Sequence, residues 1–136
     1  MKRTLINSRS PSKRATLERR ADKLIQEVCR LMYRGRCLRC KKEGHAGHHI
    51  VGRRNKDLRH KIMNVVYVCN DCHRLAESDQ EAFMEYIKIF WPAIYKWHIE
   101  HKNDPPQTIT CVTLQDNIDQ LRMLIDRLGA TDGVSI

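Results

Sequence analysis

The stretch that decides the fold runs from Cys37-Leu38-Arg39-Cys40 to Cys69-Asn70-Asp71-Cys72-His73, and each end carries a C-x-x-C pair. A two-residue spacer turns the chain enough for both sulfurs of a pair to face one ion, and tetrahedral zinc takes four thiolates at about 2.3 Å. Because 28 residues separate Cys40 from Cys69, we expect the zinc to close a long loop. The predicted ligands of this structural zinc are Cys37, Cys40, Cys69 and Cys72.

The formal net charge of +9 is unevenly distributed along the 136 residues, a length that suits one domain. Residues 1–36 carry 11 Lys and Arg against 3 Asp and Glu, residues 37–74 carry 9 against 3, and residues 75–136 carry 5 against 10. Basic surfaces attract polyanions, so nucleic acid is the expected partner. A basic tail that only adds solubility is the alternative.

The chain shows no sign of a membrane segment. No run approaches the roughly 20 apolar residues that span a bilayer. The basic start also lacks the apolar core of a signal peptide. We therefore expect a cytoplasmic protein that has no membrane partner and keeps its thiols reduced for metal binding.

Four segments are expected. Residues 1–10 read as a flexible basic arm, and residues 11–35 as an amphipathic helix with Ser10 as its N-cap, Pro11 in its first turn and Gly35 at its end. Cys29 lies beside the apolar stripe and is expected to be a buried thiol. The metal-binding core covers residues 36–77, and a helical region covers residues 78–136.

The core segment predicts two strands and a helix. His48-His49-Ile50-Val51 is expected to be extended, and alternation sends the two histidines to opposite faces. Residues 52–63 form a basic loop, and the β-branched run Val65–Val68 should pair with the His49 strand in a hairpin. Asn70 or Asp71 is expected to cap the helix that carries Cys72 and His73.

The C-terminal region predicts three helical pieces without a catalytic motif. A capping box at residues 78–81 opens the first, and Pro92 separates it from the second. Residues 108–112 should be extended, and a last helix beginning near Thr113 should stop at Gly129. We expect this helix to pack on the N-terminal helix or to form a homodimer.

In order, the core carries C-x-x-C, His48-His49-Ile50, Asn64 and C-x-x-C-His, and this set resembles the HNH endonuclease family. The resemblance covers about 37 of the 136 residues and points to the zinc-containing members common in bacteriophages and prokaryotes. It implies an α+β, helix-rich small domain around a ββα-metal (His-Me finger) unit that is stapled by the four-cysteine zinc site.

The resemblance also implies roles for individual residues. By position, His49 resembles the general base, Asn64 the central asparagine, and His48 and His73 the ligands of a catalytic ion. Many relatives carry Asp where this chain has His48, and here the chain is similar to the His-rich colicin-type nucleases. The implied cofactors are structural Zn²⁺ and a catalytic Mg²⁺, Mn²⁺, Ni²⁺ or Zn²⁺.

Phosphodiester hydrolysis needs an activated water, and a neutral histidine accepts a proton near physiological pH. We therefore expect a metal-dependent endonuclease that nicks DNA or cuts both strands. Basic residues of the 52–63 loop should hold phosphates without reading sequence. They are Arg53, Arg54, Lys56 and Arg59. In phage-like relatives the further partners are packaging or recombination proteins, and the site of action is the host cytoplasm.

Two other interpretations remain open. The same fold serves structure-selective Holliday-junction resolvases, which cut branched DNA in preference to duplex. Alternatively, the histidines are bystanders in a non-catalytic zinc-containing module that binds nucleic acid. His45 and His60 are expected to be polar loop residues, although either could complete the ligand set of the catalytic ion.

Overall fold

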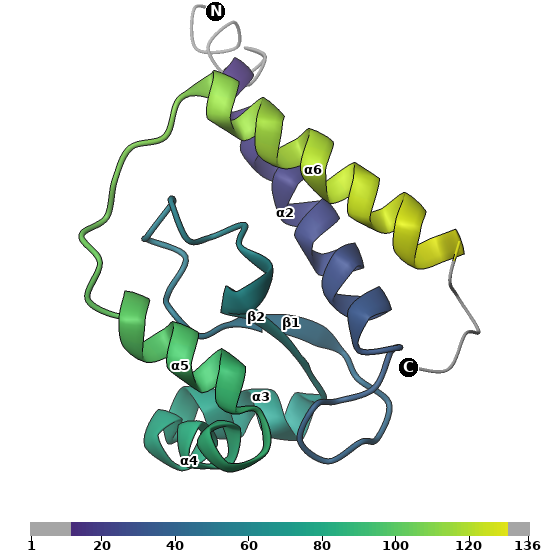
Figure 1. Ribbon diagram of the computed structural model, residues 1–136, viewed down its shortest axis with the longest axis vertical. Coiled ribbons are helices and arrows are strands. Elements are labelled where there is room, and N and C mark those ends of the chain that lie inside the picture. The colour runs from purple at the N-terminus through teal and green to yellow at the C-terminus, as the bar shows by residue number, and fades with distance from the viewer. Residues whose placement is uncertain (1–11, 131–136) are drawn as a thin grey trace, which may run out of the picture.

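A two-stranded antiparallel hairpin lies at the centre of the structure, a computed structural model that describes residues 12–130 (Figure 1). The predicted α+β class is confirmed, while the arm predicted for residues 1–10 lies outside the described residues. No helix within residues 12–130 is long and apolar enough to cross a membrane. In chain order the elements are α2 (Lys13–Met32), β1 (Ala46–His49), the 3-10 helix η1 (Ile62–Asn64), β2 (Val65–Val68), α3 (Asn70–Ser78), α4 (Gln80–Phe90), α5 (Pro92–His101) and α6 (Cys111–Ala130).

The hairpin pairs β1 with β2, with His49 opposite Val65 and Gly47 opposite Tyr67. Strand β1 begins two residues before the predicted segment 48–51 and ends at His49. All four residues of β2 are buried, which agrees with its β-branched composition. A Cβ atom on Gly47 would lie 2.6 Å from Val65 Cγ1, so only glycine allows α2 and β2 to approach β1 this closely. The predicted hairpin is confirmed.

The N-terminal helix begins later than predicted. Ser12, not Ser10, is the N-cap of α2, and its hydroxyl accepts a hydrogen bond from the Ala15 N–H at 3.1 Å. Ser10 and Pro11 lie outside the described residues. At the other end Gly35 has a φ of 72° and donates its N–H to the Arg30 carbonyl at 2.8 Å. The helix ends earlier than predicted, at Met32, and Arg34, with a φ of 57°, is already left-handed, so Gly35 lies in the turn that follows the helix.

Helix α6 lies alongside α2 and runs in the same direction (Figure 1). Leu114 and Ile118 pack with Leu17 and Ala21 of α2. The predicted packing of the C-terminal helix on the N-terminal helix is therefore confirmed. Its bounds differ, because α6 begins at Cys111 inside the segment predicted to be extended and continues through Gly129.

Helices α3, α4 and α5 pack together below the hairpin (Figure 1). Phe83 and Ile87 of α4 are fully buried in a cluster that also contains Cys37, Cys72 and Val66. The expected break at Pro92 is confirmed, since α4 ends at Phe90 and Pro92 occupies the first turn of α5.

Two predicted caps in this region are wrong. Asp79 alone caps α4, accepting from the Ala82 N–H at 3.1 Å, because Ser78 still belongs to α3. Helix α3 is capped by the Cys69 sulfur, which accepts from the Cys72 N–H at 3.4 Å, instead of by Asn70 or Asp71. The Cys69 sulfur therefore both caps α3 and belongs to the cysteine cluster.

Candidate functional site

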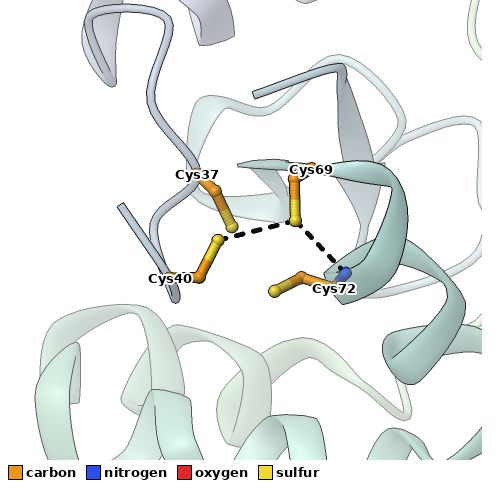
Figure 2. A group of neighbouring side chains, drawn as sticks. All are labelled: Cys37, Cys40, Cys69 and Cys72. Carbon is orange, nitrogen blue, oxygen red and sulfur yellow. Dashed lines mark hydrogen bonds between the residues drawn. The ribbon is translucent and has the colours of Figure 1, made fainter. Parts of the chain in front are cut away.

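The four predicted zinc ligands form one cluster. Cys37 and Cys40 lie in the turn after α2, Cys69 follows β2, and Cys72 lies in the first turn of α3. Their sulfurs all lie within 4.8 Å of one another and point toward a common centre (Figure 2). Tetrahedral zinc separates its sulfurs by about 3.8 Å. The cluster therefore fits a structural metal ion such as zinc.

Backbone donors prepare this cluster for thiolate charge. Burial raises the pKa of Cys37, but the N–H groups of Cys40, Cys69 and Arg39 outweigh burial and lower it to about 7. Burial raises the pKa of Cys72 to about 12, so this thiol depends most on a cation to ionise. Arg39 Nη1 lies 3.7 Å from the Cys72 sulfur and supplies part of that positive charge.

The first C-x-x-C turn is attached to the helices below it through two carbonyls. The Leu38 carbonyl accepts from Trp91 Nε1 at 3.3 Å and from Lys41 Nζ at 3.0 Å. The Tyr86 hydroxyl is shared between the Arg39 carbonyl at 3.0 Å and the Leu38 carbonyl at 3.3 Å. On the other side, the Leu38 N–H donates to the Tyr67 carbonyl of β2 at 2.9 Å. Secondary contacts of this kind orient metal ligands.

His48 of β1 and His73 of α3 face each other, with ring centroids 5.1 Å apart, and His48 also contacts the Phe83 ring at 5.8 Å. Burial, followed by the neighbouring His73 and His49, lowers the pKa of His48 to about 4. The ring is therefore neutral at pH 7. Among residues 12–130, neither the His48 nor the His73 ring has a hydrogen-bond partner, so their nitrogens remain available.

The neighbouring ring, His49, is held by backbone. Its Nε2 lies 2.9 Å from the Arg59 carbonyl in the loop between the strands. Burial lowers the pKa of His49, although the hydrogen bond to Arg59 acts in the opposite direction. His48, His49 and His73 all line one pocket of about 490 Å³. The three predicted site histidines thus share a single pocket.

Asn64 is fully buried and secures the loop that carries Arg59. Its Oδ1 accepts from the Val51 N–H at 2.7 Å, and its Nδ2 donates to the carbonyls of Val51 and Leu58 at 3.0 and 3.1 Å. Asn64 therefore fixes both ends of the 51–58 segment. Asn64 does not bond to the His49 ring, which contacts the Arg59 carbonyl.

Three of the four predicted phosphate-binding residues are ion-paired with α2. Arg53 Nη2 and Arg59 Nη2 lie 3.2 and 2.5 Å from Asp22 Oδ2, and Lys56 Nζ lies 2.9 Å from Glu18 Oε2. The Arg59 side chain is only 16% exposed, whereas that of Arg53 is 58% exposed. Arg54 is exposed and has no ion-pair partner among residues 12–130. Arg59, which was predicted to bind phosphate, therefore pairs with Asp22 within the protein.

The sequence-based prediction missed three residues that line the same pocket: Asp22 and Gln26 of α2, and Glu77 of α3. Gln26 bonds to both backbone groups of Gly47, accepting from its N–H at 2.8 Å and donating to its carbonyl at 3.2 Å. For Asp22 the available signal was an acidic pair, Glu18 and Asp22, one helical turn apart in a helix with more basic than acidic residues.

The remaining histidines lie outside the pocket lining. His45 is exposed, as expected for a loop residue. His60 is buried, and its Nε2 lies 2.8 Å from Asp22 Oδ1. His101 pairs with Asp104 at 2.7 Å. None of these three completes a ligand set with His48 and His73 in the described part of the chain.

The class that the geometry defines is a small α+β domain with a four-cysteine cluster suited to a metal ion and a separate histidine pocket. No family model, curated protein or solved structure matches the chain. Its function therefore has to be argued from the pocket itself.

Proposed function

We propose that this chain is a metal-dependent endonuclease of the HNH type that hydrolyses phosphodiester bonds in DNA. The observation that carries the proposal is the single pocket lined by His48, His49 and His73. The order β1, β2, α3, with two of these histidines on β1 and the third on α3, is the order expected of a ββα-metal unit. The net charge of +9 suits a polyanionic substrate.

His49 is the proposed general base. Because the Arg59 carbonyl can only accept a hydrogen bond, His49 Nε2 carries the ring proton in that contact. The other nitrogen, Nδ1, is then unprotonated in the neutral ring and can take a proton from water. The lowered pKa of His49 keeps the ring neutral at physiological pH.

His48 and His73 are the proposed ligands of the catalytic ion. Their rings lie 5.1 Å apart, and the lowered pKa of His48 keeps its lone pair free of a proton at pH 7. When bound, a divalent ion such as Mg²⁺, Mn²⁺, Ni²⁺ or Zn²⁺ supplies Lewis-acid stabilisation of the phosphate. Two histidines leave most of the ion's coordination positions to water and phosphate oxygens.

Arg53 and Arg54 are the proposed phosphate contacts, because both are exposed. Arg53 also lines the pocket beside His49. Arginine binds phosphate oxygens in a bidentate manner, so these two side chains would hold the strand without reading its sequence. Arg53 pairs with Asp22 at 3.2 Å but its side chain remains 58% exposed. Lys56 is the weaker candidate because it pairs with Glu18 at 2.9 Å and its side chain is only 41% exposed.

The test is cleavage of a supercoiled plasmid by the full chain loaded with structural zinc, in separate reactions with Mg²⁺, Mn²⁺, Ni²⁺ and Zn²⁺. Loss of a general base typically slows a reaction by about 10²- to 10⁴-fold, so His49→Ala should nearly abolish nicking with zinc content unchanged. His45→Ala is the matched control, since His45 is exposed and outside the pocket lining. Equal cleavage by His49→Ala and the control would remove His49 from the base role.

Substrate choice is tested by comparing duplex, single-stranded, branched and RNA substrates under the same conditions. Preferential cutting of four-way junctions would assign the protein to the resolvase alternative. Salt-sensitive binding without product under any divalent ion would support the non-catalytic binding module instead.

A further inference from the structure

Asp22, near the middle of α2, contacts three residues of the loop between β1 and β2. Its carboxylate accepts from Arg59 Nε at 2.9 Å and Arg59 Nη2 at 2.5 Å, and it lies 2.8 Å from His60 Nε2 and 3.2 Å from Arg53 Nη2. All three partners belong to the 52–63 loop. One acidic side chain on a helix therefore holds three residues that lie more than 30 positions later in the chain.

The two bonds from Arg59 restrict that residue more than a single contact would. Nε and Nη2 approach the two carboxylate oxygens as a bidentate pair, a geometry that fixes orientation as well as distance. The Arg59 side chain is 16% exposed and that of Asp22 is 23% exposed. The pair is therefore shielded from competition by water better than a surface ion pair.

The backbone of the same arginine holds His49. The Arg59 carbonyl is the group that lies 2.9 Å from His49 Nε2. A continuous chain of contacts thus runs from the Asp22 carboxylate through the Arg59 side chain to the Arg59 carbonyl and on to the His49 ring. Gln26, one turn after Asp22 on α2, holds the Gly47 backbone next to His48 in a parallel way.

The charge of Asp22 is maintained by these donors. Burial raises its pKa, but the hydrogen bonds from His60 and Arg59 outweigh burial and hold the pKa well below its ordinary value. The carboxylate is therefore ionised throughout the neutral range. Asp22 also lines the histidine pocket.

We propose that Asp22 is a positioning residue that fixes the orientation of His49 through Arg59. Helix α2 thereby orients the proposed general base. The inference rests on the proposed function in so far as it concerns cleavage, but the link between Asp22 and the His49 ring is a property of the folded chain alone.

The experiment compares wild type with Asp22→Asn, Asp22→Glu and the control Glu27→Gln in the full-length, zinc-loaded protein. Glu27 lies on the same helix and forms an exposed ion pair with Arg30, away from the 52–63 loop. Removing an outer partner of a site residue typically lowers activity by about 10- to 100-fold. We expect such a fall in kcat for Asp22→Asn, little change in KM, and partial recovery in Asp22→Glu.

A second readout does not depend on activity. Nitrogen-15 NMR of the histidine rings at a fixed pH reports which nitrogen of His49 carries the proton. Wild type and Glu27→Gln should show the Nε2–H form, and Asp22→Asn should show a mixture of the two ring forms.

The outcomes separate the two proposals. A wild-type chain that never cleaves DNA, but whose His49 signal changes in Asp22→Asn, overturns the nuclease and keeps the positioning role. Wild-type cleavage combined with an unchanged kcat and an unchanged His49 signal in Asp22→Asn overturns the positioning role and keeps the nuclease. If Asp22→Asn unfolds, Arg59→Gln, which removes the same bidentate pair from the other side, is measured in its place, and wild-type behaviour of that variant in both readouts also overturns the positioning role.

Discussion

The cysteine cluster and the histidine pocket differ in how completely the chain assembles them. Among residues 12–130, the four cysteines are the only group of three or more Cys, His, Asp or Glu side chains whose ligand atoms gather closely enough to hold an ion. The histidine pocket brings two rings to 5.1 Å and leaves a space of about 490 Å³. A closed ligand set suits a structural ion, whereas an incomplete one leaves room for water and substrate.

The comparison is tested most strongly by removing the metal from the cysteine cluster. Structural zinc contributes roughly 10 to 16 kcal/mol in small zinc-finger peptides, as much as the whole stability of a typical domain. In Cys72→Ser, or with a chelator, the hairpin and α3 should therefore lose their cooperative melting transition. Thermal melting followed by circular dichroism measures this loss, and zinc content is measured on the same samples. Cys111→Ser is the control, because Cys111 lies apart from the cluster. A Cys72→Ser protein that melts like the control would show that the cluster is dispensable.

The stability of the fold around the histidine pocket should depend on buried hydrogen bonds, whereas that of the cysteine cluster depends on a metal ion. Asn64→Ala leaves the N–H and the carbonyl of Val51 without their partner and removes one of the two donors to the Leu58 carbonyl, so we expect a loss of about 2–4 kcal/mol in the free energy of unfolding. Urea denaturation measures the change, with the exposed Asn103→Ala as control. Similar midpoints for the two variants would mean that Asn64 does not hold the loop.

Acid should weaken the fold through His48. Its pKa is about 4 when folded and about 6.5 when unfolded, so the unfolded state binds more protons between these values and stability falls as pH drops from 6.5 toward 4. His48→Gln cannot titrate and should lose less stability over this interval. Urea midpoints at pH 7 and pH 5 measure the difference, and zinc release at low pH acts on both proteins alike. Identical pH dependence would contradict a buried neutral His48.

The smallest effect is expected in the exposed part of the 52–63 loop. Arg54 is exposed and has no ion-pair partner within residues 12–130, so Arg54→Ala should remove one phosphate contact and lower the salt dependence of DNA binding by about one unit of slope. Lys96→Ala on the exposed side of α5 is the control. Titrations at several salt concentrations measure the slope, and equal slopes for both variants would exclude Arg54 from the interface.

Features set by local sequence were predicted well. The two C-x-x-C pairs gather as their spacing requires, and the strand Val65–Val68 follows from its β-branched run. The apolar stripes of α2 and α6 pack together as expected. In each of these cases a short repeat or a fixed spacer within one segment determines which side chains that segment presents to its partner.

Features set by distant partners were not predicted. The contact between Asp22 and Arg59 joins residues 37 positions apart, and no periodicity in either segment indicates it. The Cys69 cap of α3 was missed for a similar reason, because a sulfur gathered by the cluster takes a place that Asn70 or Asp71 would fill in an isolated peptide. The proposed roles of His48, His49, Asn64 and His73 stay predictions until cleavage is measured.

Helix α6 contributes no residue to the histidine pocket or the cysteine cluster, yet Leu114, Ile118 and Leu121 support the apolar side of the helix that carries Asp22 and Gln26. A protein truncated after His101 would retain every proposed ligand and base but expose Leu17, Ala21 and Ile25 to water. Helix α2 would then keep its hydrogen bonds to Gly47 and Arg59 but lose the apolar support on its other side. Helix α6 thus supports the site from the opposite side of α2, and removing it would disturb a site that it does not contact.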